Sequence, residues 1–95
     1  MKYFLVLSTL TDEGRKTVLD NPERIRQVNK AIEAKGTKIV AQYALLGAYD
    51  FMTIIQAKDN IDVFKAAVEV GSRGTIQTIT IPAIPIDEFI EAIKV

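Results

Sequence analysis

The side chains of this sequence that could carry chemistry fall in three short segments, far apart along the chain. Each segment offers hydroxyl, guanidinium, phenol or carboxylate groups: Ser8, Arg15, Tyr49, Asp50, Ser72 and Arg73. Two guanidinium groups and a phenol could bind an anionic ligand in bidentate fashion. Alternatively, a carboxylate could act as a base while a phenol or an arginine stabilises developing negative charge. The residue types alone allow both kinds of site, so no catalytic residue is assigned.

Histidine and cysteine are both absent from the chain. Their absence removes the commonest base near neutral pH, the commonest transition-metal ligand and every thiolate nucleophile. The sequence shows no loop motif for Mg²⁺ or Ca²⁺, although this does not exclude a site for either ion made only of carboxylates. We therefore expect no metal and no cofactor, and we favour binding over catalysis.

Length and charge limit the partners. The 95 residues predict a single domain over residues 1–95, and 48% hydrophobic with 25% charged residues is typical of a globular chain. Twelve basic residues balance twelve acidic ones, so the basic surface that nucleic-acid binding requires is not expected. The apolar run 3–7 is too short for a signal segment or a membrane span. We expect a cytoplasmic protein with neither a nucleic-acid nor a membrane partner.

Four apolar segments predict β-strands. Residues 3–8 form a continuous apolar run, typical of a strand that is buried on both faces. Residues 39–46 and 51–57 predict a hairpin, because the residues between them begin with Gly47. Residues 75–81 alternate β-branched residues with Gln77 and predict a fourth, partly exposed strand.

Helices are predicted between these strands. Thr11 begins a short helical turn, and the segment 21–23 predicts a helix start with Asn21 as the N-cap and Pro22 at the first position. Asp59 is expected to cap a later helix, and the segment after Pro85 predicts a short terminal helix. The apolar stripes expected from the helical spacing are Ile25, Val28 and Ile32, then Ile61, Phe64 and Val68, then Ile86, Phe89, Ile90 and Ile93. The second of these, on the helix after Asp59, is expected to be buried.

The resulting order is β-α-β-β-α-β with a terminal helix, which predicts an α+β, ferredoxin-like fold. Right-handed crossovers place the first and third strands at the centre of a four-stranded antiparallel sheet. In this topology the segments 8–15, 47–50 and 71–74 meet at one edge, where the polar residues named above could form a ligand site. The alternative is purely structural: Asp50 forms a surface ion pair with an arginine, and the glycines of 71–74 only end a helix.

The central strands also predict self-association. Residues of both parities are apolar in 3–7 and in 51–55, whereas the two main helices can cover only one face of the sheet. An uncovered apolar face of that size is a docking surface. We expect a homodimer formed sheet to sheet, with the terminal helix as a possible extra cover. A lysine at Val6 or Met52, whichever faces away from the helices, should disrupt it.

The tetrapeptide Gly47-Ala48-Tyr49-Asp50 between two apolar strands resembles the Gly-x-Tyr-Asp signature of the GYD domain family. The segments 11–14, 21–24 and 71–74 are similar to that family's helix-start and late-turn segments, so the resemblance covers nearly the whole chain. It implies a ferredoxin-like fold of the dimeric α/β-barrel kind. The family has no established activity, so the resemblance carries no catalytic residue. Ala48 stands where the family often has a basic residue, which removes one anion contact.

Three functions are compatible with these observations. The first is an oligomeric module that binds a small, polar or anionic ligand at the loop edge. The second is a cofactor-free enzyme of the oxygenase or isomerase type, which rests on fold analogy alone. The third is a purely structural subunit of an assembly.

Overall fold

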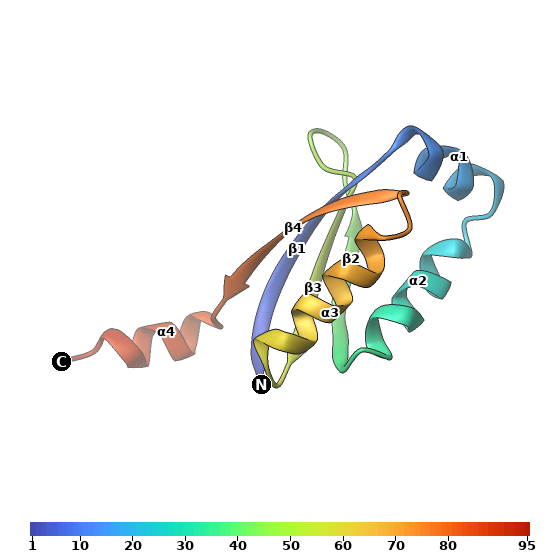
Figure 1. Ribbon diagram of the computed structural model, residues 1–95. Helices are drawn as coiled ribbons and strands as arrows, with labels where there is room; N and C mark the ends of the chain where they lie inside the picture. Colours follow the sequence, from blue (N-terminus) through green and yellow to red (C-terminus); the bar gives the residue numbers. More distant parts are fainter.

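The computed structural model describes residues 1–95, with four strands and four helices along the chain (Figure 1). The elements are β1 (Lys2–Leu10), α1 (Asp12–Asp20), α2 (Arg24–Glu33), β2 (Thr37–Ala44), β3 (Phe51–Ala57), α3 (Asn60–Gly71), β4 (Ile76–Ala83) and α4 (Ile86–Ile93). The four strands form one antiparallel sheet in the order β2-β3-β1-β4. The α+β, ferredoxin-like fold is therefore confirmed, and the first and third strands are central as predicted.

The hairpin that joins β2 to β3 is longer than a tight turn. The Leu45 N–H donates to the Asp50 carbonyl oxygen at 2.8 Å, which closes the loop. Gly47 lies at φ +125, a conformation that side chains with a Cβ rarely adopt. The pairing of β2 with β3 also shifts between Ile39 and Ala41, the signature of a β-bulge.

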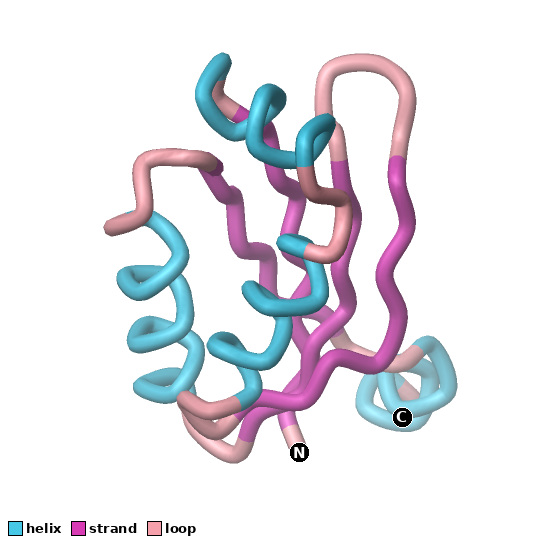
Figure 2. Tube along the Cα trace, turned by 90° about the vertical axis from the view of Figure 1, so that its right-hand side faces the viewer, coloured by secondary structure: helices cyan, strands magenta, loops and turns pink.

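Helices α2 and α3 lie side by side on one face of the sheet (Figure 2). The apolar stripe of α2 turns toward the sheet as predicted, but the stripe predicted for α3 is wrong. Val63, Ala66 and Val70 are the buried residues of α3, whereas the predicted Ile61, Phe64 and Val68 are exposed. Both sets recur at helical spacing, because α3 is apolar around most of its circumference. Only the packing of α3 on the sheet selects between them.

The predicted start of α2 is also wrong. Thr11 caps α1 as expected, since its hydroxyl accepts a hydrogen bond from the Gly14 N–H at 3.1 Å. However, α1 continues to Asp20, and Asn21 ends it by donating its N–H to the Thr17 carbonyl oxygen. Helix α2 then begins at Arg24 without a side-chain cap. The first helix is longer than the sequence suggested, so Asn21 closes one helix instead of opening the next.

The two faces of the sheet differ sharply in chemistry. The face without helices carries apolar rows across all four strands: Tyr43, Met52, Leu7 and Ile79 in one, and Ala41, Ile54, Leu5 and Ile81 in the next. The neighbouring row on the helix-covered face is largely polar: Gln42, Thr53, Val6 and Thr80. Each of the two apolar rows is thus more hydrophobic than this covered row.

The small core lies at the other end of the covered face, where Phe4, Ile55, Ala57 and Val63 pack together. Helix α4 covers neither face, because it projects beyond the end of β4 (Figure 1). Its apolar residues are exposed, from 42% for Ile90 to 68% for Ile86. None of the helices has both the length and the hydrophobicity to cross a membrane.

Candidate functional site

The three loop segments meet at one end of the sheet, as the topology predicted. The Thr11 N–H donates to the Thr75 carbonyl oxygen at 3.0 Å, and the Thr11 hydroxyl donates to the Gly74 carbonyl oxygen at 3.0 Å. On the hairpin side, the Asp50 N–H donates to the Ser8 carbonyl oxygen at 2.8 Å. The end of β1 is thus held by both the hairpin and the turn that follows α3.

Asp50 is the central polar residue of this edge. Its carboxylate accepts a hydrogen bond of 2.7 Å from the Leu10 N–H, and the nearest Arg15 nitrogen lies 3.9 Å from Oδ2. The side chain of Asp50 is 30% exposed, and Arg15 also pairs with Asp12 at 3.2 Å. A charge-assisted hydrogen bond to a backbone N–H is strong and directional. Asp50 therefore fastens the hairpin to the last residue of β1.

The other predicted site residues do not all join this pair. Arg73 pairs with Glu69 at 3.1 Å instead of with Asp50, and its Nε is buried without a hydrogen-bond partner. Ser72 is exposed and donates its hydroxyl to the Glu69 carbonyl oxygen, a contact that only ends α3. Tyr49 is half-buried on the hairpin. Among the predicted site residues, only Arg15 therefore brings its side chain to the Asp50 carboxylate. The ligand-binding role of all six residues stays a prediction.

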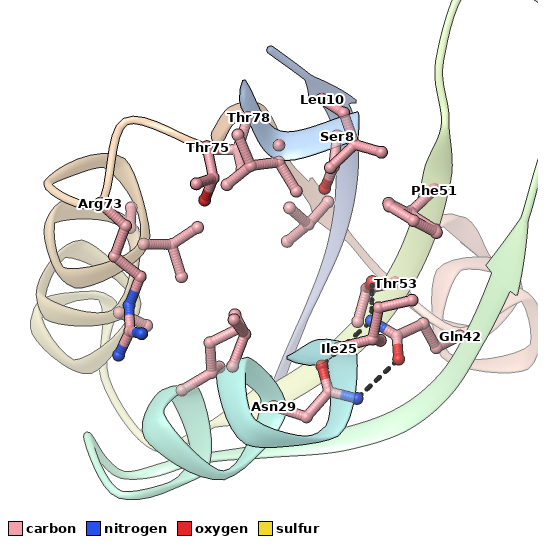
Figure 3. Close-up of a pocket in the computed structure, with 18 of the residues that line it drawn as sticks. Ser8, Leu10, Ile25, Asn29, Gln42, Phe51, Thr53, Arg73, Thr75 and Thr78 are labelled. Carbon is pink, nitrogen blue, oxygen red and sulfur yellow. Dashed lines mark hydrogen bonds between the residues drawn. The ribbon is translucent and has the colours of Figure 1, made fainter. Parts of the chain in front are cut away.

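Ser8 is buried and faces the helices, where it lines a cavity between the sheet and α1, α2 and α3 (Figure 3). The volume of this cavity is about 100 Å³, and Arg73 lies on its α3 side. Sequence reasoning missed the other polar residues that line it: Thr17, Arg24, Asn29, Gln42, Thr53, Thr75, Thr78 and Thr80. The sequence alternation in 75–81 could have revealed two of these residues, because Thr78 and Thr80 have the parity of the helix-covered face.

A network of amide side chains crosses one side of this cavity (Figure 3). The Asn29 amide donates to Gln42 Oε1 at 2.7 Å, and Gln42 Nε2 donates to Asn29 Oδ1 at 3.2 Å and to the Thr53 hydroxyl at 3.1 Å. Because α2, β2 and β3 each contribute one residue, the network holds α2 against the sheet. The structure has no cluster of three or more acidic, histidine or cysteine residues suited to a metal ion.

The fastening role of Asp50 gives a first prediction. Asp50→Ala should lower the free energy of unfolding by about 1–3 kcal/mol, because the Leu10 N–H loses its partner in a partly buried place. Chemical denaturation with urea measures the change. Asp12→Ala is the matched control, since that carboxylate is fully exposed and its removal should have little effect. Equal midpoints for Asp50→Ala and the unmutated protein would contradict the fastening role.

Comparison with known proteins gives four further findings. The GYD domain family matches residues 4–93. The chain is 46% identical over 95 residues to a Thermus thermophilus protein named glutamine synthetase and cystathionine beta-lyase binding protein, an alignment that covers 99% of this chain and all of the relative. Among solved structures, MtbAldR (Rv2779c) superposes with a TM-score of 0.66 at 21% identity over 88% of this chain, which spans about half (52%) of the MtbAldR chain.

A second solved structure, TTHA0845 from Thermus thermophilus, superposes with a TM-score of 0.57 at 20% identity. The superposition covers 90% of this chain and 95% of the TTHA0845 chain. At these identities both superpositions establish the fold alone.

Proposed function

The chain belongs to the GYD domain family, and from this premise we propose that it is an oligomeric protein-binding module. In this proposal two copies associate through the faces of the sheet that carry no helices. Other proteins then bind to the opposite, helical side of each subunit. The observation that carries the proposal is the contrast between the two sheet faces described above.

The helix-free face supports the homodimer. Its apolar rows run without interruption across the sheet, and Leu5 and Leu7 lie at their centre. Four strands of about eight residues span roughly 20 by 25 Å, a footprint of about 500 Å². This is the larger part of the roughly 800 Å² per partner that standard interfaces bury. A polar solvent-facing side is usual for antiparallel sheets with one covered face. Here the helix-free face is apolar instead, which favours a second copy of the sheet as the partner that covers this face.

Helix α4 supports the same assembly. Its apolar residues have no cover within their own chain, and the helix starts directly after β4, at the edge of the open face. In a dimer, this stripe would extend the apolar surface that each subunit offers to the other. Helix α4 of one subunit would then cover part of the helix-free sheet face of the other subunit, as the extra cover that the sequence predicts.

The outward stripe of α3 supports binding of other proteins. Ile61, Phe64 and Val68 are 57%, 67% and 70% exposed, respectively, and together they form an apolar ridge on the side away from the sheet. A helix face of this kind is a common anchor in protein recognition. The name of the Thermus thermophilus relative points in the same direction, because it describes a protein that binds two enzymes.

A binding experiment tests the partner part of this proposal. The immobilised protein is offered glutamine synthetase and cystathionine beta-lyase from its own source organism. We expect at least one enzyme to be captured and Phe64→Ser to weaken capture by about tenfold or more, as for a buried aromatic anchor. Leu19→Ser, which removes another exposed apolar side chain, is the matched control and should bind normally. Capture of neither enzyme, or full capture by Phe64→Ser, would refute the proposed partners or the proposed surface.

A small anionic ligand is a second candidate function. It is favoured by the Arg73 Nε, which is buried without a partner, and by Arg15, which is half-exposed beside Asp50. The oxygenase- or isomerase-type alternative would need Asp50 to be free to accept a proton from a substrate. Because the Leu10 N–H and Arg15 already face this carboxylate, the geometry supports binding over proton abstraction.

A further inference from the structure

We propose that the cavity between the sheet and helices α1, α2 and α3 binds a small carboxylate with a compact aliphatic body. The inference rests on the small-ligand function above and deepens it, since it names the class of ligand and moves the site from the loop edge to the interior. Of the residues that the sequence placed at the edge, only Ser8 and Arg73 belong to this cavity.

The size of the cavity limits the ligand. Its volume of about 100 Å³ is somewhat smaller than an apolar protein cavity of about 150 Å³ that accepts benzene. A ligand of roughly five or six non-hydrogen atoms therefore fits. Long acyl chains, nucleotides and sugars would extend out of this space into solvent.

The walls and the floor of the cavity have different chemistry. The helices contribute aliphatic walls, including Ile25, Val28 and Val63. The sheet contributes hydroxyl groups from Ser8, Thr78 and Thr80, at positions that normally carry aliphatic side chains when helices cover them. The Thr53 hydroxyl and the side-chain amides of Asn29 and Gln42 form hydrogen bonds with one another. The remaining hydroxyls are thus available to a ligand that has both an aliphatic and a polar end.

The charges select an anion. Arg24 and Arg73 line the cavity, and no aspartate or glutamate does. Glu69 occupies only Nη2 of Arg73, so the buried Nε–H of Arg73 is left without an acceptor. A buried donor of this kind is costly until an acceptor reaches it. A ligand carboxylate would supply that acceptor once the Arg73 side chain, which is 25% exposed, turns its Nε–H toward the cavity. An amine of the same size would find no negative partner.

The probe for this site is isobutyrate, and thermal denaturation gives the readout. At about ten times its dissociation constant, isobutyrate should raise Tm by roughly 6–10 °C for a domain of this size. Isobutylamine and isobutanol have the same aliphatic body without the negative charge and should produce no comparable shift. Inorganic phosphate has the charge without the aliphatic body and should also fail.

Three variants locate the binding. Ala67→Leu fills the cavity from α3 and should abolish the isobutyrate shift, and Arg73→Gln should abolish the preference for the carboxylate over isobutanol. Arg15→Ala removes only the loop-edge cation and should respond like the unmutated protein. In a second measurement on the unmutated protein, isobutyrate should move the NMR methyl signals of Ile25 and Val63 but not that of exposed Leu19.

The outcomes separate the two ligand proposals. If isobutyrate binds but Arg15→Ala abolishes binding and Ile25 and Val63 do not respond, the ligand lies at the loop edge and the cavity inference is wrong. If neither isobutyrate nor phosphate stabilises the protein or moves any methyl signal, both the cavity inference and the small-ligand function fail. The NMR measurement decides the matter even if Ala67→Leu does not fold.

Discussion

Leu7→Lys is expected to convert the proposed dimer into folded monomers. Leu7 occupies the middle of an apolar row on the helix-free face, paired with Met52 on one side and Ile79 on the other. In a dimer each subunit would place an ammonium group in the dry centre of the interface, and burying an unpaired charge there is very costly. A loss of about 4 kcal/mol or more, in the range of the strongest interface residues, raises the dissociation constant roughly a thousandfold.

The measurement is sedimentation velocity at micromolar concentration, with a monomer mass of 10.5 kDa as the reference. In the separated subunit Leu7 lies on the helix-free face and is only partly buried, so the variant should retain its fold and its circular dichroism spectrum. Leu19→Lys introduces the same charge at an exposed site on α1 and should remain dimeric. If the unmutated protein sediments as a monomer, or Leu7→Lys as a dimer, the sheet-to-sheet assembly is refuted.

Gly14→Ala is expected to destabilise the fold by about 2–4 kcal/mol, because the added methyl group would overlap backbone that cannot move away. Gly14 is buried in the first turn of α1, and a Cβ there would clash with the carbonyl group of Thr75. That carbonyl is fixed by the hydrogen bond from the Thr11 N–H. Alanine favours a helix over glycine by about 1 kcal/mol, which offsets only part of the cost.

Urea denaturation measures this effect, and Gly71→Ala is the matched control. Gly71 ends α3, has ordinary backbone angles and has open space where a Cβ would stand. The control should therefore raise the free energy of unfolding by up to about 1 kcal/mol. A destabilised Gly14→Ala beside an unchanged or stabilised Gly71→Ala would show that the close approach to Thr75 matters. Equal responses from the two variants would contradict it.

The amino-acid sequence determined the elements of this protein and their order. Strand runs are recognisable by β-branched and apolar residues, and the hairpin by Gly47, because those preferences act over a few neighbouring residues. Chain order and the handedness of crossovers then place β1 and β3 at the centre of the sheet. The gathering of the three loop segments at one edge follows from the same topology, and the structure confirms it.

Which face of a helix is buried, and at which residue a helix ends, were decided by the tertiary structure. Two stripes on α3 satisfy the same spacing, and only contact with the sheet buries Val63, Ala66 and Val70 while leaving Phe64 outside. Asn21 is an equally good residue at either end of a helix, and the length of α1 assigns it to the earlier one. In both cases the local pattern has two solutions of similar energy, so long-range packing makes the choice.

Side-chain partners were also beyond the sequence. The register of β1 with β3 puts Val6 and Met52 on opposite faces, and the position of α2 and α3 shows that Met52 is on the open one. Arg73 was expected near Asp50, yet Glu69 lies one helical turn before it on α3 and takes its guanidinium instead. The spacing of four residues allowed the Glu69–Arg73 pair from the sequence. The fold topology also allowed Asp50 as a partner of Arg73, and the choice between them depends on distances of a few ångströms in the folded chain. The tertiary structure alone therefore separates the Asp50 fastening from the cavity that Arg73 lines.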